Sequence, residues 1–362
     1  MLMTGPVSSA PPTASPGGAR NERARGILRL IGRSVLRTVV ILWLVATVTF
    51  LAVRALPGNA VDVWIQELQG TGITADEARH QATILLGIDV DEPLWHQYVS
   101  YLNNLVHLDL GRSVILSPGA PVAGMLGERI LWTLFSVGMA LLIAFLIGMY
   151  LGSLAAYRRN TWVDRVITYG GALLDSVPSV LLGILLTFTL GVALGIVPIQ
   201  AMRGAYDPGL IPGPNLPFIL SALAHAFLPG LIYVIGSVGG WTLLMRSSAI
   251  SVLKDDYVTQ ARARGLAERT IRASYVVRNA QLPLVTGFAI SMGFIISGSV
   301  LVEAVFVYPG VGQLLANALA RRDYTVMQGV VIATTLTVLL ATAVADALYG
   351  WLDPRTRDER AA

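Results

Sequence analysis

The chain has 362 residues, of which 54% are hydrophobic and 13% are charged, and its formal net charge is +4. Ordinary soluble domains carry about 25% charged residues, so this composition and the mean hydropathy of +0.64 indicate an integral membrane protein. The absence of cysteine excludes disulfides, thiol catalysis and cysteine-ligated metals. The basic residues also lack interleaved aromatic residues, so no nucleic-acid surface is predicted.

The first segment, residues 1–33, is predicted to be a disordered and basic cytoplasmic tail. Its beginning is rich in Pro, Ala, Ser, Thr and Gly without an apolar period, and arginines follow. The apolar run over 34–53 suits a first transmembrane helix, and the arginines before it place its N-terminus inside by the positive-inside rule. No small-residue cleavage site closes this run, so an uncleaved helix is favoured over a signal peptide.

Residues 54–129 are predicted to form an extracytoplasmic helical cap. Acidic residues outnumber arginines in this section, which agrees with an outside location. The sequence TADEARHQATILLGI begins with a threonine suited to capping a helix. The sequence EPLWHQYVSYLNNLVHL has apolar and aromatic residues at helical spacing. These residues are Leu94, Tyr98, Tyr101, Leu102 and Leu105.

The rest of the chain, 130–352, is dominated by apolar runs of spanning length. These runs occupy 130–157, 166–197, 216–245, 284–302 and 326–351. Arginine-rich flanks place the loop 246–283 and the short tail 353–362 on the cytoplasmic side. The sequence therefore predicts an all-α polytopic membrane protein with six transmembrane helices and with both termini in the cytoplasm.

Motifs for chemistry are missing from the sequence. It has no GxxxxGK[ST] loop for nucleotide phosphates and no HExxH zinc motif, so this chain is not expected to hydrolyse ATP. His225 with Ser237 or Ser299 is a poor pair for an intramembrane serine protease, and His225 is interpreted as a packing residue. We therefore predict no catalytic residue and no metal site.

Polar residues within the apolar runs are candidates for a translocation pathway. A charged Asp175 at bilayer depth costs about 2.5 to 3.5 kcal/mol on insertion scales, so it should face a cavity or a partner. The alternative, which we favour, is that its carboxylate caps a half-helix restarting at Ser176-Val177-Pro178. Small residues near 291–299 either allow close helix packing or line a pore. The pathway candidates are Asp175, Ser291, Ser297 and Ser299.

Residues 254–283 form a charged stretch between two apolar runs. Asp255 or Asp256 suits the start of a short helix, and Gly265 suits its end. A second helix over 267–281 is expected to stop at the proline that follows. Two short helices that meet at a glycine predict a rigid cytoplasmic knob that a soluble partner contacts. The alternative is a bare amphipathic helix lying on the membrane surface.

Several motifs carry a resemblance to a known family. QARARGL, followed by RNAQLP, resembles the EAA-type cytoplasmic loop of ABC importer permeases, in the variant of the dipeptide and oligopeptide permease family. RALPGN, LLGIDVDEPLWHQYVSYLNNLVHLDLGRS, EAVFVYPGVGQLLANALARRDYTVMQG and LDPRTR resemble further blocks of that family, and together they cover about 35–357. Thr259 and Gln260 depart from the general loop pattern, and Asn59 replaces an aspartate.

The resemblance implies a type I ABC importer permease fold and a defined set of partners. These are a second, similar permease subunit in a heterodimer, two cytoplasmic ABC ATPase subunits and an extracytoplasmic solute-binding protein. ATP and Mg²⁺ would be bound by the ATPase subunits, and this chain would bind no cofactor. It would lie in a bacterial plasma membrane, in contact with membrane lipid.

The resemblance also implies a function for the knob. ATP-driven closure of the ATPase subunits would move it and switch the pore by alternating access. The implied coupling residues are Asp256, Tyr257, Gln260, Ala261, Arg262, Ala263, Arg264, Gly265 and Leu266. Dipeptides or oligopeptides are the first choice of substrate, and oligosaccharides or nickel complexes are the alternatives. A secondary transporter is disfavoured because internal repeats and paired mid-membrane charges are lacking.

Overall fold

The computed structural model describes residues 16–55, 69–70, 72–74, 76–77, 80, 92–198, 203–298 and 300–352. These residues form helices joined by turns and loops, and they contain no strand apart from an isolated bridge between Arg112 and Pro121. The predicted all-α class is therefore confirmed.

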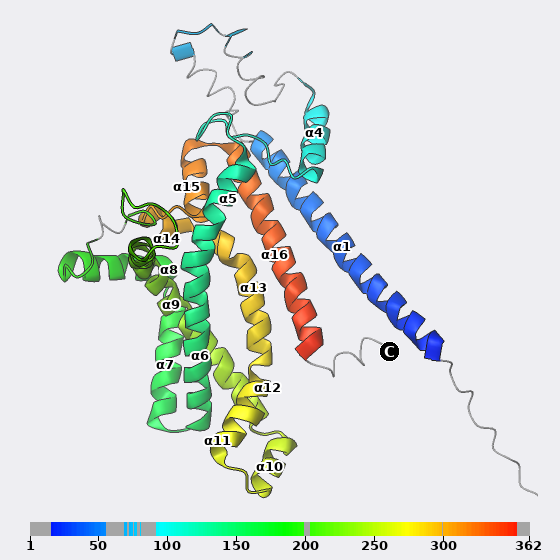
Figure 1. Ribbon diagram of the computed structural model, residues 1–362, viewed down its shortest axis with the longest axis vertical. Helices are drawn as coiled ribbons and strands as arrows, with labels where there is room; N and C mark the ends of the chain where they lie inside the picture. The colour runs from blue at the N-terminus through cyan, green and yellow to red at the C-terminus, as the bar shows by residue number, and fades with distance from the viewer. Residues whose placement is uncertain are drawn as a thin grey trace, which may run out of the picture.

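The helices are labelled in Figure 1. In the first half of the chain they are α1 (Pro16–Ala55), α4 (Leu94–Val106), α5 (Val122–Thr133), α6 (Met139–Tyr157), α7 (Trp162–Ser176) and α8 (Ser179–Leu186). In the second half they are α9 (Leu216–Val252), α10 (Asp256–Ala263), α11 (Glu268–Thr270), α12 (Arg278–Ala280), α13 (Leu282–Gly298), α14 (Val300–Val305), α15 (Val311–Arg321) and α16 (Tyr324–Leu352). The described π-helical segments are η1 (Leu134–Gly138), η2 (Thr187–Ala193) and η3 (Ile271–Val277), and each continues a neighbouring helix.

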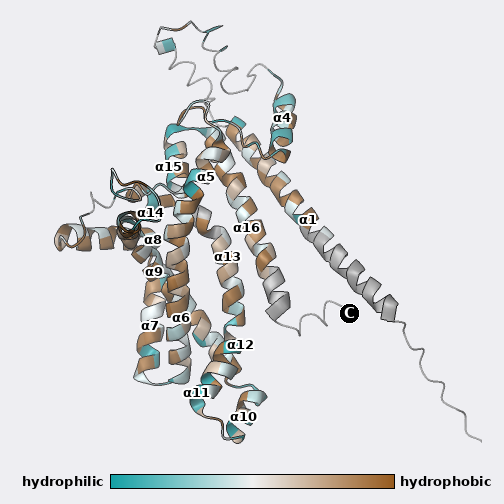
Figure 2. Cartoon of the chain, viewed as in Figure 1, coloured by the Kyte–Doolittle hydropathy of each residue, from teal (hydrophilic) through white to brown (hydrophobic). Residues whose placement is uncertain are grey.

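The long helices form a bundle in which α6 and α7 pack on α9, while α1 and α13 pack on α16. Toward its N-terminal end, α1 leans away from the bundle (Figure 1). The ends of α1 and α16 that lead to the chain termini point toward the same end of the bundle as α10 and α11 (Figure 1). Figure 2 shows apolar residues along the middle of the long helices and polar residues at both ends of the bundle. This banding is that of a protein that crosses a membrane.

Four helices among the described residues are long and apolar enough to span a membrane, namely Val35–Ala55, Val122–Tyr157, Leu216–Val252 and Tyr324–Ala345. They coincide with the first, second, fourth and sixth predicted spans. The fifth predicted span coincides with α13, a shorter apolar helix. The predicted six-helix arrangement is compatible with this structure.

The third predicted span, 166–197, does not run straight. It is divided into α7 and α8, and the two helices meet at an angle of 96°. Val177 between them is extended, with φ −88° and ψ 120°. Pro178 is the physical reason, because its ring disfavours helical backbone in the preceding residue. As a result α8 and η2 lie across the bundle axis (Figure 1).

The two ends of the chain differ from the predicted boundaries. Helix α1 begins at Pro16, so part of the predicted tail 1–33 is helical. Residues 1–15 and 353–362 lie outside the described residues, as does most of TADEARHQATILLGI. Helix α4 forms where the helical spacing predicts it, and the Tyr98 hydroxyl lies 2.7 Å from Thr47 Oγ1 of α1.

The contact between α6 and α9 depends on two glycines of α6. A Cβ atom on Gly148 would lie 3.0 Å from the backbone of Trp241. A Cβ atom on Gly152 would lie 2.6 Å from Cβ of Met245 and even closer to a backbone oxygen of α9. Any larger residue at these two positions would force the helices apart, which is the usual role of small residues between membrane helices.

A buried carboxylate joins the segments at the opposite end of the bundle from α10. Asp323, which precedes α16, is 0% exposed. It accepts hydrogen bonds from Ser113 Oγ at 2.6 Å and from the backbone N–H groups of Ile115 and Leu116 at 2.9 Å. The segment before α5 is thereby fixed to the start of α16, so the cap section is tied to the bundle.

Candidate functional site

Helix α10 begins at the predicted aspartates. Asp255 is its N-cap residue, with extended backbone at φ −70° and ψ 145°, and its side chain makes no capping hydrogen bond. The Asp255 carbonyl oxygen accepts the N–H of Val258 at 3.0 Å. Asp256 lies in the first turn, where a negative charge interacts favourably with the helix dipole. The predicted start of the helix is confirmed, although a backbone contact replaces the side-chain cap.

Helix α10 ends in a Schellman turn around Gly265. The Gly265 N–H donates to the Arg262 carbonyl at 2.9 Å, and the Leu266 N–H donates to the Ala261 carbonyl at 3.3 Å. Gly265 has φ +74°, in the left-handed region. An added Cβ would have no atom within 4 Å, so a larger residue meets only the backbone cost of about 1 to 2 kcal/mol.

One side of α10 packs against η3 and belongs to an apolar cluster that it shares with the long helices. Val258 and Ala261 are fully buried in an apolar cluster that continues into the bundle. Its other members include Met245 of α9, Ile271 of η3 and Leu284 of α13. The main contact of α10 is with η3, so a displacement of α10 would reach the long helices through η3 and this shared cluster. This packing disfavours the alternative of an isolated helix on the membrane surface.

The opposite side of α10 is exposed in the described part of the chain. Most of the predicted coupling residues are exposed there, namely Asp256, Gln260, Arg262, Ala263, Arg264, Gly265 and Leu266. Tyr257 is half-buried. Ala261 is 1% exposed and contributes to the internal packing of α10, and its coupling role stays a prediction. Arg262 Nε also contacts Glu268 Oε1 at 2.9 Å, an exposed pair across the Gly265 turn.

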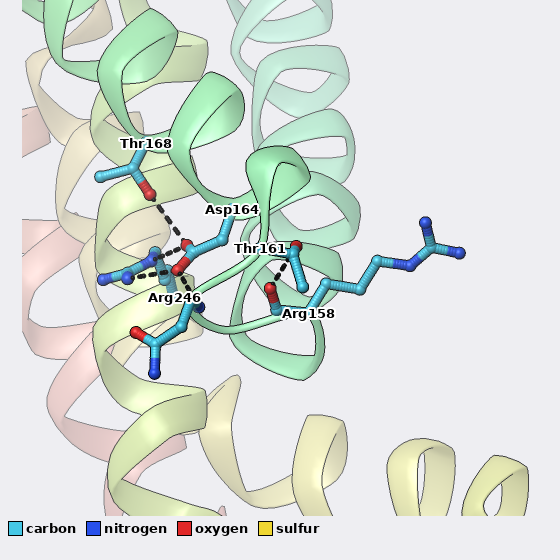
Figure 3. Close-up of polar contacts among 6 residues, drawn as sticks. Arg158, Thr161, Asp164, Thr168 and Arg246 are labelled. Carbon is cyan, nitrogen blue, oxygen red and sulfur yellow. Dashed lines mark hydrogen bonds and ion pairs between the residues drawn. The ribbon is translucent and has the colours of Figure 1, made fainter.

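A partly buried ion pair between Asp164 and Arg246 braces the same end of the bundle (Figure 3). Arg246 of α9 donates from Nε to Asp164 Oδ1 at 2.6 Å and from Nη2 to Oδ2 at 3.0 Å. Asp164, near the start of α7, also accepts the Asn160 N–H at 3.0 Å and the Thr168 hydroxyl at 3.1 Å. Asp164 is only 4% exposed. This bidentate arrangement fixes the turn between α6 and α7 to α9.

Asp175 lies in the last turn of α7, beside the bend. A Cβ atom on Gly240 of α9 would lie 2.8 Å from Asp175 Oδ1, so the carboxylate lies against α9. The prediction that this carboxylate caps the next half-helix is wrong, because Pro178 is the N-cap residue of α8 and no side chain makes a capping hydrogen bond there. Asp175 is exposed on the surface of this single chain.

Comparison with known proteins identifies the family. The family described as binding-protein-dependent transport system inner membrane component matches residues 148–358, which is more than half of the chain. This chain belongs to that family. The permease is 31% identical over 328 residues to a protein of Brucella abortus (strain 2308) whose name describes a peptide transport system permease, covering 91% of this chain and 98% of that protein. It is also 31% identical over 333 residues to GsiC of Escherichia coli (strain K12), named a glutathione transport system permease protein, with 91% and 99% covered. The resemblance to ABC peptide importer permeases is thereby confirmed.

The serine candidates lie on or near α13 of the permease. Ser291 is half-buried there. Two residues further along, a Cβ atom on Gly293 would lie 2.7 Å from Cβ of Ala341 in α16, so small residues serve close helix packing at this point. The side chain of Ser297 and the whole of Ser299 lie outside what the structure describes.

Two features were not predicted from the sequence. One is the ion pair between Asp164 and Arg246, called the brace, and the other is the close contact of α6 with α9 at Gly148 and Gly152. A signal for the contact exists, because Gly148 and Gly152 form a GxxxG pattern in an apolar run. For the brace, the signal is Asp164 at the inner end of one predicted span and Arg246 at the inner end of another. His225 matches its interpretation as a packing residue, since it is 2% exposed and its Nδ1 lies 2.8 Å from the Ser221 carbonyl oxygen.

Proposed function

We propose that this permease is one of two membrane-spanning subunits of an ATP-driven importer that moves peptides, including short ones such as glutathione, into the cell. A second permease subunit completes the pore, and an extracytoplasmic binding protein delivers the substrate. Two cytoplasmic ATPase subunits bind ATP and Mg²⁺, since this chain has no phosphate-binding loop. The names of the similar permeases support peptide and glutathione as the substrate class.

The orientation in this proposal places α10 and both chain ends in the cytoplasm. Arginine-rich sequence flanks the inner ends of the predicted spans. The ends of α1 and α16 that lead to the termini point to the same end of the bundle as α10, which agrees with a shared side (Figure 1).

The coupling proposal depends on one observation, the two-sided environment of α10. Its outer side exposes Gln260, Arg264 and Leu266, which are available to a soluble partner. Its inner side buries Val258 and Ala261 in a cluster shared with the long helices. A partner that moves α10 therefore moves a packed unit, and alternating access follows if the bundle has two stable arrangements.

Replacing Gly265 tests this role. In the complete transporter, Gly265→Arg should abolish uptake and remove the stimulation of ATP hydrolysis by loaded binding protein, while the protein remains in the membrane. Gly265→Asn should retain most uptake, because asparagine tolerates left-handed backbone better than other residues. Gly209→Arg is the matched control, since Gly209 has φ +92°, also has open space around its Cβ and is far from α10 in the sequence. Normal uptake with Gly265→Arg would refute the coupling role of α10.

The substrate is tested on the binding protein, where specificity is expected to reside. Thermal shifts of the cognate binding protein should be largest with dipeptides, oligopeptides or glutathione. A larger shift with oligosaccharides or nickel complexes would replace peptide by one of these alternatives.

Asp175 is proposed as a pathway residue. Its exposed carboxylate interrupts a membrane-length apolar segment, and such a group needs water or a partner. At the bend beside it one helix ends and another begins, and helix ends leave backbone groups without intrahelical partners. Such groups are tolerated at membrane depth where they face a cavity or protein.

A further inference from the structure

A hollow of about 430 Å³ lies where α6 meets η3. The α6 wall includes Leu146, Tyr150 and Ser153, and the opposite wall includes Arg269 and Arg272. The hollow lies outside α10, outside the Asp164 brace and away from Asp175. It combines two cationic groups with an apolar wall.

Arg272 is held in place within this hollow. Its Nη2 donates to Ser153 Oγ at 3.2 Å, and its guanidinium lies 5.3 Å from the centre of the Tyr157 ring. An arginine has five N–H donors in a planar fork that matches the geometry of phosphate, and one bond to a serine leaves most of them available. A guanidinium that is already positioned loses little side-chain entropy when it binds an anion.

The positive charge of the hollow is not neutralised by the described part of the chain. No described carboxylate lies within ion-pair distance of Arg269 or Arg272. Glu268 is the neighbour in sequence, and its carboxylate is paired with Arg262. An anion from outside the chain is therefore the natural counterion.

The apolar wall indicates what kind of anion fits. Leu146 is 49% exposed and Tyr150 is 63% exposed, and Leu142, one turn further from Tyr157, is 45% exposed. Tyr150 lies about 10 Å along the helix axis from Tyr157, where α6 ends. The arginines thus lie near one end of a span, and an exposed apolar strip leads from them toward its middle. A phospholipid has the same arrangement, with a charged phosphate at the membrane surface and apolar acyl chains that extend toward the middle of the membrane.

We propose that this hollow binds the phosphate of an anionic phospholipid in the cytoplasmic leaflet, with Arg269 and Arg272 on the headgroup and the exposed strip of α6 along an acyl chain. The cytoplasmic assignment rests on the orientation given above under the proposed function. The site lies between α6 and the segment that continues from α10 through η3, so a bound lipid contacts both the bundle and the knob.

Photo-crosslinking in the complete transporter tests the proposal. Tyr150→benzoylphenylalanine places a photoreactive ring in the hollow and keeps an aromatic side chain there. After illumination in membranes, mass spectrometry should find a phospholipid adduct enriched in anionic over zwitterionic lipid relative to the bulk membrane. Each arginine near an anionic surface contributes about fivefold to binding, so Arg269→Gln with Arg272→Gln should lower this enrichment by up to about 25-fold.

Control variants make the outcomes separable. Arg158→Gln with Arg159→Gln removes two exposed arginines from the end of α6 that do not line the hollow, and it should leave the adduct unchanged. Arg269→Gln alone should lower the enrichment about fivefold even if loss of Arg272 disturbs folding. A protein adduct to an ATPase or to the second permease, an adduct insensitive to Arg269→Gln, or full competition by inorganic phosphate would each overturn the proposal. Crosslinking does not require transport. A missing lipid adduct would therefore refute the lipid site alone, and loss of uptake would bear on the proposed transport function.

Discussion

Replacing Asp164 by alanine should loosen the end of the bundle that carries α10. Asp164 is 4% exposed and accepts hydrogen bonds from Arg246, Asn160 and Thr168. Removing one partner of a buried ion pair costs about 3 to 5 kcal/mol. The Arg246 side chain is 26% exposed and regains some hydration, so we expect a loss of about 2 kcal/mol. At about 2 °C per kcal/mol for a chain of this size, the melting temperature should fall by about 4 °C.

A double-mutant cycle on the purified transporter measures the pair itself. Asp164→Ala leaves a partly buried guanidinium without its carboxylate, and the added Arg246→Leu removes that guanidinium. The double variant should therefore lose less stability than the two single variants together. Glu268→Gln is the control, because it breaks the exposed pair with Arg262, and it should change the melting temperature by less than about 1 °C. The ion pair would not be stabilising if the stability losses of the two single variants simply added up in the double variant. The same conclusion would follow if Glu268→Gln lowered the melting temperature as much as Asp164→Ala.

Three further substitutions probe other parts of the chain. Gly152→Leu should prevent accumulation of the folded permease in membranes, because the leucine side chain would overlap α9 at less than van der Waals distance. The amount of permease is measured by immunoblot. Gly170→Leu is the control and should accumulate normally, because open space surrounds that position. Asp323→Asn should destabilise the transporter by about 2 to 3 kcal/mol in thermal unfolding, because a buried charged hydrogen-bond acceptor is lost. Asp109→Asn, at an exposed position, is the control and should leave the stability unchanged. Asp175→Asn should lower substrate uptake with assembly and melting temperature unchanged, and normal uptake would remove Asp175 from the pathway.

The segments of the fold could be predicted because apolar length and charged flanks are local properties of the sequence. The spans, the helix α4 and the turn at Gly265 all follow from composition, spacing and backbone preference. The bend between α7 and α8 was only partly foreseen. Pro178 signals a break, but an angle of 96° depends on packing against α9, which the sequence does not specify.

In the candidate site, too, local features could be predicted from the sequence and long-range contacts could not. The position and start of α10 were predictable from Asp255 and Gly265, whereas the burial of Ala261 depends on which side of the helix meets η3. The brace was missed because Asp164 and Arg246 lie far apart in the sequence, and only folding brings them to 2.6 Å. Long-range polar pairs of this kind carry little local signal.

The bend between α7 and α8 also bears on how the chain enters the membrane during synthesis. On its own, α7 is about 22 Å long, shorter than the roughly 30 Å hydrocarbon layer. The insertion machinery must therefore accept the apolar sequence of both helices as one segment. Helix α8 packs against α9 in the folded chain, and this contact is possible only after α9 has been synthesised. We therefore expect the stretch to enter the membrane before it takes up its bent arrangement.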